Sequence, residues 1–270
     1  MFQLSNHGPD VHVGTGPQYP WGGLYGGQIV AQALRAAAYS ADPGALPHSI
    51  RAYFIRRGDA TEPVRYEVDR IRNGRSFSTR RVVARQAIGA ILNAESSFQQ
   101  PEQSVEIQTV EMADVPPADV LEKESWSPSF ERADVPAERL ADSRRDGAGR
   151  RVSWMRVTDP IASSNDHEGQ LLHRCWLAFL SDDLPTDSVF QAHPNADDPE
   201  FQANRFTASL DHTVWFHRPI EVNQWHLHDF SCLHLVGGRG LALGQVFTVD
   251  GVHAATVAQE VLVRDLRERD

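Results

Sequence analysis

The chain contains one structural pattern twice, and this repeat limits its possible folds more than any other feature. A helical pattern of apolar residues over 28–39 precedes four strand-like segments, and a second helical pattern over 169–183 precedes four more. The segment 53–56 (Tyr-Phe-Ile-Arg) matches 215–218 (Trp-Phe-His-Arg) at an offset of 162 residues, and Gly89 matches Gly251 at the same offset. We therefore predict two helix-plus-antiparallel-sheet units, of the α+β class, whose sheets join into one continuous sheet. The strand-like segments are 49–56, 64–72, 76–86 and 90–99, then 209–218, 225–236, 240–249 and 253–264, with a further strand at 151–157.

An acidic segment separates the two predicted units. Residues 101–147 hold twelve acidic and five basic residues, and prolines at 116, 117, 128 and 136 interrupt them. We interpret this segment as a linker with short helical pieces, for example over 136–143, and residues 186–207 as a polar loop. The predicted organisation is an N-terminal unit (1–100), the linker (101–147) and a C-terminal unit (148–270).

Net charge, cysteine content and hydropathy indicate the binding partners and the cellular compartment to expect. A formal net charge of -10 argues against a general nucleic-acid binder, and the isolated Cys175 and Cys232 fit a reducing compartment. No apolar run reaches the ~18 residues that span a bilayer, so we expect no membrane insertion and a cytoplasmic location. Residues 51–85 carry ten arginines and four acids. These arginines are interpreted as solvated strand faces in preference to a phosphate-binding patch.

Three polar residues interrupt rows that are otherwise apolar. Gln259 alternates with valines and alanines in the last strand, Asp182 lies on the apolar face at the end of the second helix, and Ser209 opens the strand at 209–218. A buried polar group costs about 1–3 kcal/mol unless it is paired, so the three predict a shared site if the fold brings them together. The alternatives are a solvated carboxylate, an ordinary edge-strand serine and an amide that pairs with a neighbouring backbone group.

Other candidate residues give weaker signals. Gly26 and Gly27 leave backbone N–H groups bare at a helix start, which suits an anion or a carbonyl oxygen. On this motif alone, a tight turn before a packed helix is the favoured interpretation. His226, His228 and His234 lie close together, but no metal-binding motif accompanies them, and we expect no metal. The chain has no Gly-x-Ser-x-Gly elbow, which argues against a serine-hydrolase mechanism. His48 and Asp211 are candidates for substrate contacts or for structural roles.

Several motifs resemble the acyl-CoA thioesterase II family. They are GGQIVAQAL (26–34), HSIRAYFIRRGD (48–59), NGRSFSTRRV (73–82) and SFQ (97–99), then LDH (210–212), WFHRP (215–219), RG (239–240), DG (250–251) and QE (259–260). The resemblance implies a double hotdog fold and hydrolysis of medium- to long-chain fatty acyl-CoA to free acid and CoA without metal or covalent cofactor. It also implies a catalytic set of Asp182, Ser209 and Gln259, with the adjacent Asp183 as an alternative to Asp182.

The resulting hypothesis is direct hydrolysis by a positioned water molecule. Asp182 acts as general base, Ser209 and Gln259 hold the water, and a backbone N–H of Gly26 or Gly27 binds the thioester carbonyl. The alternatives are a non-hydrolytic acyl-CoA-binding hotdog protein and a hotdog enoyl-CoA hydratase. Because hotdog sheets often pair edge to edge, we also expect a homo-oligomer, either a dimer or a tetramer.

Overall fold

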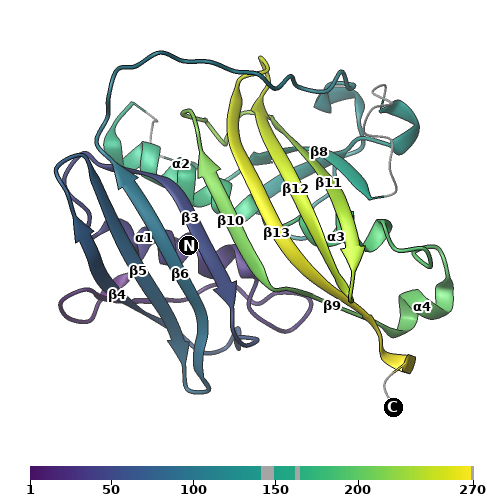
Figure 1. Ribbon diagram of the computed structural model, residues 1–270, viewed down its shortest axis with the longest axis horizontal. Coiled ribbons are helices and arrows are strands. Elements are labelled where there is room, and N and C mark those ends of the chain that lie inside the picture. Colours follow the sequence, from purple (N-terminus) through teal and green to yellow (C-terminus); the bar gives the residue numbers. More distant parts are fainter. Residues whose placement is uncertain (141–148, 162–164, 269–270) are drawn as a thin grey trace. The chain divides into compact units, whose positions relative to one another are not determined.

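The computed structural model describes residues 1–140, 149–161 and 165–268, which form two compact units (Figure 1). Unit 1 comprises Met1–Ile107, Ile161–Leu180 and Thr213–Glu221, and unit 2 comprises Gln108–Pro160, Ser181–His212 and Val222–Asp270. The division of the chain into 1–100, 101–147 and 148–270 stays a prediction from the sequence, whereas units 1 and 2 are defined by contacts.

Unit 1 pairs an antiparallel sheet with two helices. Helix α1 (Gly26–Ala38) packs across strands β3, β5 and β6, and helix α2 (His167–Leu180) packs against α1 and β3 (Figure 1). The fully buried alanines of α1 keep the helix surface flat, and this lets the sheet approach closely. The strands hydrogen-bond in the order β1 (Ser5–Asn6), β2 (Val11–Gly14), β4 (Val64–Asn73), β5 (Phe77–Gln86), β6 (Gly89–Gln99) and β3 (Leu46–Phe54).

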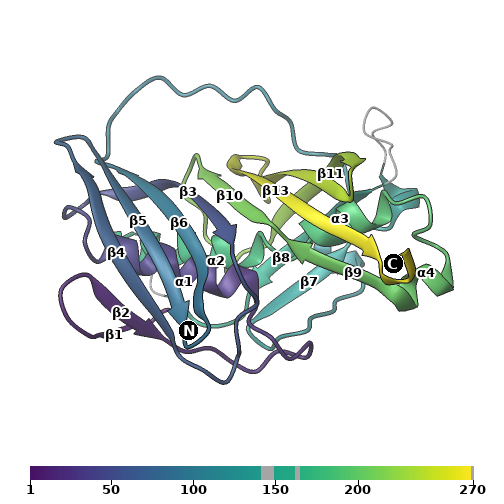
Figure 2. The ribbon, with the colours of Figure 1, turned by 60° about the horizontal axis from the view of Figure 1, so that its bottom comes forward.

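In unit 2, helix α3 (Pro185–Gln191) packs against strands β11, β12 and β13 of the antiparallel sheet (Figure 2). A buried cluster that includes Val152, Trp154 and Leu227 covers part of this sheet, and residues Val110 and Met112 of the predicted linker pack on the cluster. The strand order is β13 (His253–Asp265), β12 (Arg239–Thr248), β11 (His226–Val236), β8 (Arg150–Val157) and β7 (Phe130–Asp134), and β9 (Arg205–Ser209) also pairs with β13. The remaining helical elements are η1 (Ala118–Val120), α4 (Pro199–Asn204), η2 (Ala137–Arg139) and η4 (Leu266–Glu268).

Four local predictions need correction. The second helix ends at Leu180 rather than at residue 183. It begins at His167, and the side chain of the preceding Asp166 accepts the backbone N–H of Gly169. Residues 186–207 are not a loop, because α3 and α4 lie there and each has a proline at its start, the position proline favours. The linker contains the unpredicted strand β7, and the helical piece at 136–143 is a short 3-10 turn as far as residue 140, with 141–143 outside the described residues.

The fourth correction concerns the strand at 209–218. Two strands occupy this region: β9 ends at Ser209, and β10 (Asp211–Phe216) begins two residues later. Leu210 lies between them and donates its backbone N–H to the carbonyl of Glu260, while the backbone N–H of Glu260 donates to the carboxylate of Asp211 at 2.7 Å. At the break, the Asp211 carboxylate thus takes the place of the backbone carbonyl that would accept this hydrogen bond in a continuous pair of strands. Asp211 and His212 belong to unit 2, and the remainder of β10 belongs to unit 1.

Four of the ten arginines of residues 51–85 form ion pairs on strands β4 and β5 of unit 1. Arg65 and Arg85 share Glu67, and Arg81 pairs with Asp69. Arg80 is instead fully buried, where it donates to the backbone carbonyl of Ser40. Because the four paired guanidinium groups already contact carboxylates, they fit the interpretation as solvated strand faces better than the interpretation as a phosphate-binding patch.

Candidate active site

Gln259 lies at the centre of a buried hydrogen-bonded chain in unit 2. Its side chain is 0% exposed, in a row with buried Val257 and Val261 on β13, so the predicted burial of this amide is confirmed. Its Nε2 donates to the Ser209 hydroxyl at 2.7 Å, and its Oε1 contacts Nδ1 of His212. Ser209 pairs in register with Val261, two residues from Gln259, which places the hydroxyl and the amide on diagonal positions of neighbouring strands.

His212 extends the chain to the turn that follows α2. Its Nε2 lies 2.8 Å from the hydroxyl of Ser181, and both side chains are 0% exposed. Four side chains in unit 2 are therefore joined in the order Ser181, His212, Gln259 and Ser209.

Asp182 directly follows Ser181, so their Cα atoms are about 3.8 Å apart across one peptide bond. Asp182 is 7% exposed, which rules out a solvated carboxylate in a fraying last turn. It lies in the turn between α2 and α3 and not in the helix itself. The structure thus links Ser209 and Gln259 directly and places Asp182 next to the far end of the same chain of hydrogen bonds.

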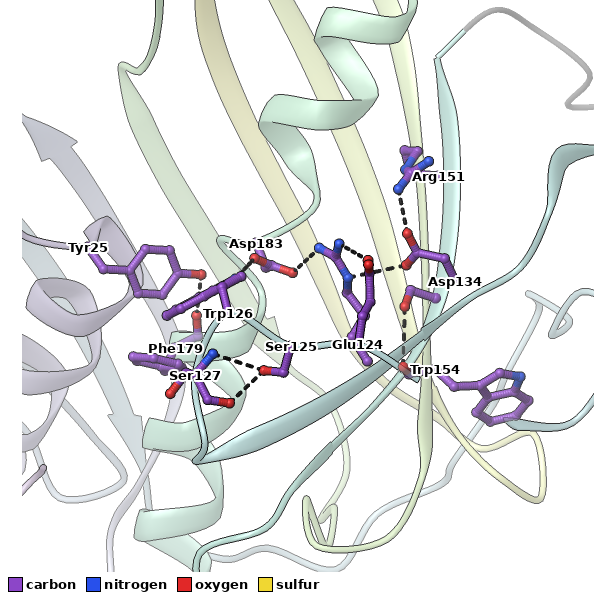
Figure 3. Close-up of polar contacts among 12 residues, drawn as sticks. Tyr25, Glu124, Ser125, Trp126, Ser127, Asp134, Arg151, Trp154, Phe179 and Asp183 are labelled. Carbon is purple, nitrogen blue, oxygen red and sulfur yellow. Dashed lines mark hydrogen bonds and ion pairs between the residues drawn. The ribbon is translucent and has the colours of Figure 1, made fainter. Parts of the chain in front are cut away.

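The neighbouring Asp183 has a different environment. Its two carboxylate oxygens accept from Nε1 of Trp126 at 2.7 Å and from the guanidinium of Arg132 at 2.8 Å (Figure 3). Arg132 also pairs with Glu124 and Asp134, and Asp134 pairs with Arg151. Asp183 therefore belongs to an ion-pair network with residues of the predicted linker, and this favours Asp182 as the residue of the candidate set.

The break at Leu210 explains how Ser209 and His212 reach the same amide. In a continuous strand, residues three positions apart point to opposite faces of the sheet. Here β9 ends at Ser209 and β10 begins at Asp211, so the alternation is interrupted and both side chains contact Gln259. Such irregularities are frequent beside active sites, where they redirect a side chain.

Burial also sets the charge of His212. Desolvation lowers the pKa of this imidazole to about 4, although its hydrogen bond to Gln259 acts in the opposite direction. His212 is therefore neutral at neutral pH and carries one ring N–H. An imidazole in this state can donate at one nitrogen and accept at the other.

Gly26 and Gly27 begin α1 in unit 1. The first turn of α1 contains no acidic residue, and the preceding Tyr25 gives no side-chain cap. A Cβ on Gly27 would lie 2.3 Å from the carbonyl oxygen of Phe179, which also accepts a hydrogen bond from the Tyr25 hydroxyl at 2.9 Å (Figure 3). Close packing alone thus requires glycine at position 27, and a substrate-binding role for the two glycines stays a prediction.

Two residues of the chain, His212 and Ser181, were not predicted as site residues. His212 shares the buried face of β10 with Val214 and Phe216, and a polar residue in such a row is the signal that could have identified it. Ser181 gives no comparable signal. Nε2 of His48, in unit 1, forms a hydrogen bond with the hydroxyl of Ser97 at 2.8 Å, and this contact fits a structural role for His48.

The histidines of β11 do not form a metal cluster in the structure. The rings of His226 and His228 are 5.0 Å apart, while His234 is exposed beyond a register shift. Across residues 1–140, 149–161 and 165–268, no three histidine, cysteine or acidic side chains converge as ligands for an ion. Over the same residues, every helix is too short or too polar to traverse a bilayer.

Comparisons with known proteins identify relatives of this chain. Family models described as the acyl-CoA thioesterase N-terminal and C-terminal domains match residues 16–99 and 103–263. Acyl-CoA thioesterase 2 of Haemophilus influenzae is 34% identical over 253 residues, covering 89% of this chain and 87% of that protein. Acyl-coenzyme A thioesterase 8 of Mus musculus is 34% identical over 266 residues, covering 89% and 80%.

Solved structures agree. The acyl-CoA thioesterase II TesB2 from Mycobacterium marinum superposes with a TM-score of 0.85 at 31% identity, covering 100% of this chain and 97% of that one. A protein with a hot dog fold from Alicyclobacillus acidocaldarius, 21% identical, shares the fold with a TM-score of 0.77, covering 97% and 96%. The predicted double hotdog is thereby confirmed. Within that class, the chain belongs to the acyl-CoA thioesterase family.

Proposed function

We propose that this protein hydrolyses acyl-CoA thioesters to a free acid and CoA by direct attack of water. The observation that carries the proposal is the buried hydrogen-bonded chain from Ser181 to Ser209, with the buried carboxylate of Asp182 next to one end. Family membership supplies the substrate class, and the chain of hydrogen-bonded side chains supports the proposal that one water molecule is held and activated there.

In this mechanism Asp182 is the general base. It takes a proton from the water as the water oxygen bonds to the thioester carbon. The carbon–sulfur bond then breaks, and the proton returns to the departing thiolate. A positioned base contributes about 10²–10⁴-fold to such a step. We assign the role of carbonyl-polarising donor to a backbone N–H of Gly26 or Gly27, because N–H groups at the start of a helix favour negative charge.

Ser209 serves as a water ligand and not as a nucleophile. A nucleophilic serine needs a neighbouring base that removes its proton. Among the described residues the hydrogen-bond partner of the Ser209 hydroxyl is the amide nitrogen of Gln259, which donates and cannot accept that proton. A covalent acyl-serine intermediate is therefore disfavoured.

Release of free thiol from acyl-CoA tests the proposal directly. Incubation of the purified protein with octanoyl-CoA and palmitoyl-CoA in the presence of DTNB should give a steady rate of thiol release. Binding without thiol release would favour the non-hydrolytic acyl-CoA-binding protein. Loss of the double bond of an enoyl-CoA without thiol release would favour the hydratase.

Replacement of Gln259 by alanine tests the water-holding role. We expect kcat to fall by about 10²-fold, the scale for loss of one preorganised donor. Thr256→Ala is a matched control on the same strand, because its side chain alternates with the buried row and should leave kcat unchanged. A Gln259→Ala variant that is folded by circular dichroism and has wild-type kcat would remove Gln259 from the mechanism.

Three finer properties remain part of the proposal. The preference for medium- to long-chain acyl groups, the homo-oligomeric state and the cytoplasmic location are predictions from the sequence and its resemblance. The same thiol assay across an acetyl- to palmitoyl-CoA series, together with light scattering, addresses the first two.

A further inference from the structure

The hydrogen-bonded chain in unit 2 continues past the residues expected to touch water. Beyond Gln259 come His212 and Ser181, both 0% exposed, and neither is needed to hold the water itself. The donor and acceptor of each hydrogen bond in the chain indicate the role of His212 and Ser181.

The amide of Gln259 fixes the tautomer of His212. An amide oxygen can only accept, so the ring N–H of the neutral imidazole lies on Nδ1 and donates to Oε1 of Gln259. Nε2 then carries a lone pair, and it accepts the hydroxyl proton of Ser181 at 2.8 Å. The donors run in one direction, from Ser181 through His212 to Gln259.

The same arrangement couples the orientation of Gln259 to the tautomer of His212. Rotation of the amide by half a turn would place its NH2 group against the N–H of His212, and relieving this clash would require His212 to change tautomer and Ser181 to turn from donor to acceptor. With Oε1 held by His212, Nε2 must point to Ser209, whose oxygen accepts at 2.7 Å. The hydroxyl proton of Ser209 is then the donor at the end of the chain.

We infer that His212, supported by Ser181, is a positioning residue that holds the Gln259 amide in the one orientation that leaves the Ser209 proton free to donate to the hydrolytic water. This inference rests on the proposed function. A water that accepts from Ser209 keeps both of its own protons, and one of them is then available to Asp182. In the opposite orientation the amide would accept from Ser209, and the water would lose this donor.

If His212 had only a structural role, any side chain of similar size with hydrogen-bond partners would replace it. If His212 positions Gln259, the replacement must keep a hydrogen-bond donor at the place of Nδ1. Two substitutions separate these requirements, because the asparagine amide nitrogen can occupy the place of Nδ1 and the longer glutamine amide reaches the place of Nε2. His212→Asn therefore keeps a donor for Gln259, and His212→Gln keeps an acceptor for Ser181.

The test compares kcat and KM of both variants with wild type in the thiol-release assay. We expect His212→Gln to lose about 10²-fold in kcat, as for a misplaced donor, and His212→Asn to keep kcat within about tenfold. KM should change little in either, because His212 touches Gln259 and Ser181 in this chain and is not proposed to touch substrate. Equal losses in both variants, or a larger loss in His212→Asn, would overturn the inference, and unfolding temperatures measured alongside show whether either variant is simply unstable.

A double-mutant cycle provides the second readout. If His212 acts through Gln259, His212→Gln should lower kcat by no more than about threefold in a Gln259→Ala background, because coupled residues are not additive. Additive losses would show that His212 acts independently and would overturn the inference. If wild type releases no thiol, the proposed function fails instead. If Asp182→Asn remains fully active, only the assignment of the base fails, so these failures are distinguishable from failure of the inference.

Discussion

Replacing Asp182 with asparagine is expected to lower kcat for acyl-CoA hydrolysis by about 10²-fold or more, the scale for loss of a general base. The amide has nearly the same shape as the carboxylate but cannot accept a proton from water. Because Asp182 is 7% exposed and follows Ser181 in a tight turn, an isosteric change is a milder perturbation than alanine. The rate of thiol release from palmitoyl-CoA at saturating substrate measures the effect.

Asp183→Asn is the matched control, because the two carboxylates are adjacent and both are largely buried. Asp183 already accepts from Trp126 and Arg132, so its loss should weaken the ion-pair network and lower the unfolding temperature. We expect kcat of this variant to stay within about threefold of wild type at a temperature where it is folded. The reverse pattern, an inactive Asp183→Asn and an active Asp182→Asn, would transfer the role of base to Asp183.

The parts of the site that lie in regular strands could be predicted from the sequence. Gln259 interrupts a strict alternation of buried residues on β13, and the period of two fixes which face it occupies. The repeated helix-plus-meander pattern likewise predicted the fold class, because alternation and helical spacing persist over many residues. Predictions of this kind rest on local periodicity, which the sequence displays directly.

The irregular parts could not be predicted in the same way. The break at Leu210 depends on the Asp211 carboxylate replacing a backbone acceptor for Glu260, a contact between residues 49 positions apart. Without that break, strand alternation would place Ser209 and His212 on opposite faces. The sequence pattern therefore missed His212, even though a histidine in the buried row of β10 is unusual.

The choice between Asp182 and Asp183 depended on contacts that lie far away in the sequence. Both residues follow the same helix, and helical spacing does not separate neighbours at a fraying end. Trp126 and Arg132, 57 and 51 residues away from Asp183, pair with Asp183 and thereby favour Asp182 as the candidate base. No periodic pattern predicted that this part of the acidic segment belongs to unit 2.

The largest expected effect on stability is at the buried ion pair of Arg150 and Asp229. The guanidinium donates to both carboxylate oxygens, at 3.1 and 2.9 Å, and the side chains are 4% and 3% exposed. Asp229→Leu removes this partner and leaves a guanidinium in the interior of unit 2. We expect the free energy of unfolding to fall by about 3–5 kcal/mol, the cost of breaking a buried pair from one side. Urea unfolding monitored by circular dichroism measures the change.

The double variant Arg150→Met with Asp229→Leu separates the charge effect from packing. If the cost of Asp229→Leu comes from the remaining buried charge, removing the charge as well should recover most of the lost stability, because apolar pairs often replace buried ion pairs without loss. A double variant as unstable as Asp229→Leu would show that the buried charge is not the cause of the lost stability. Neither residue is part of the Ser181-to-Ser209 chain, so kcat of the folded double variant should equal that of wild type. A loss of kcat there would mean that the position of β11 also determines the geometry at Gln259, through β12, which pairs with both β11 and β13.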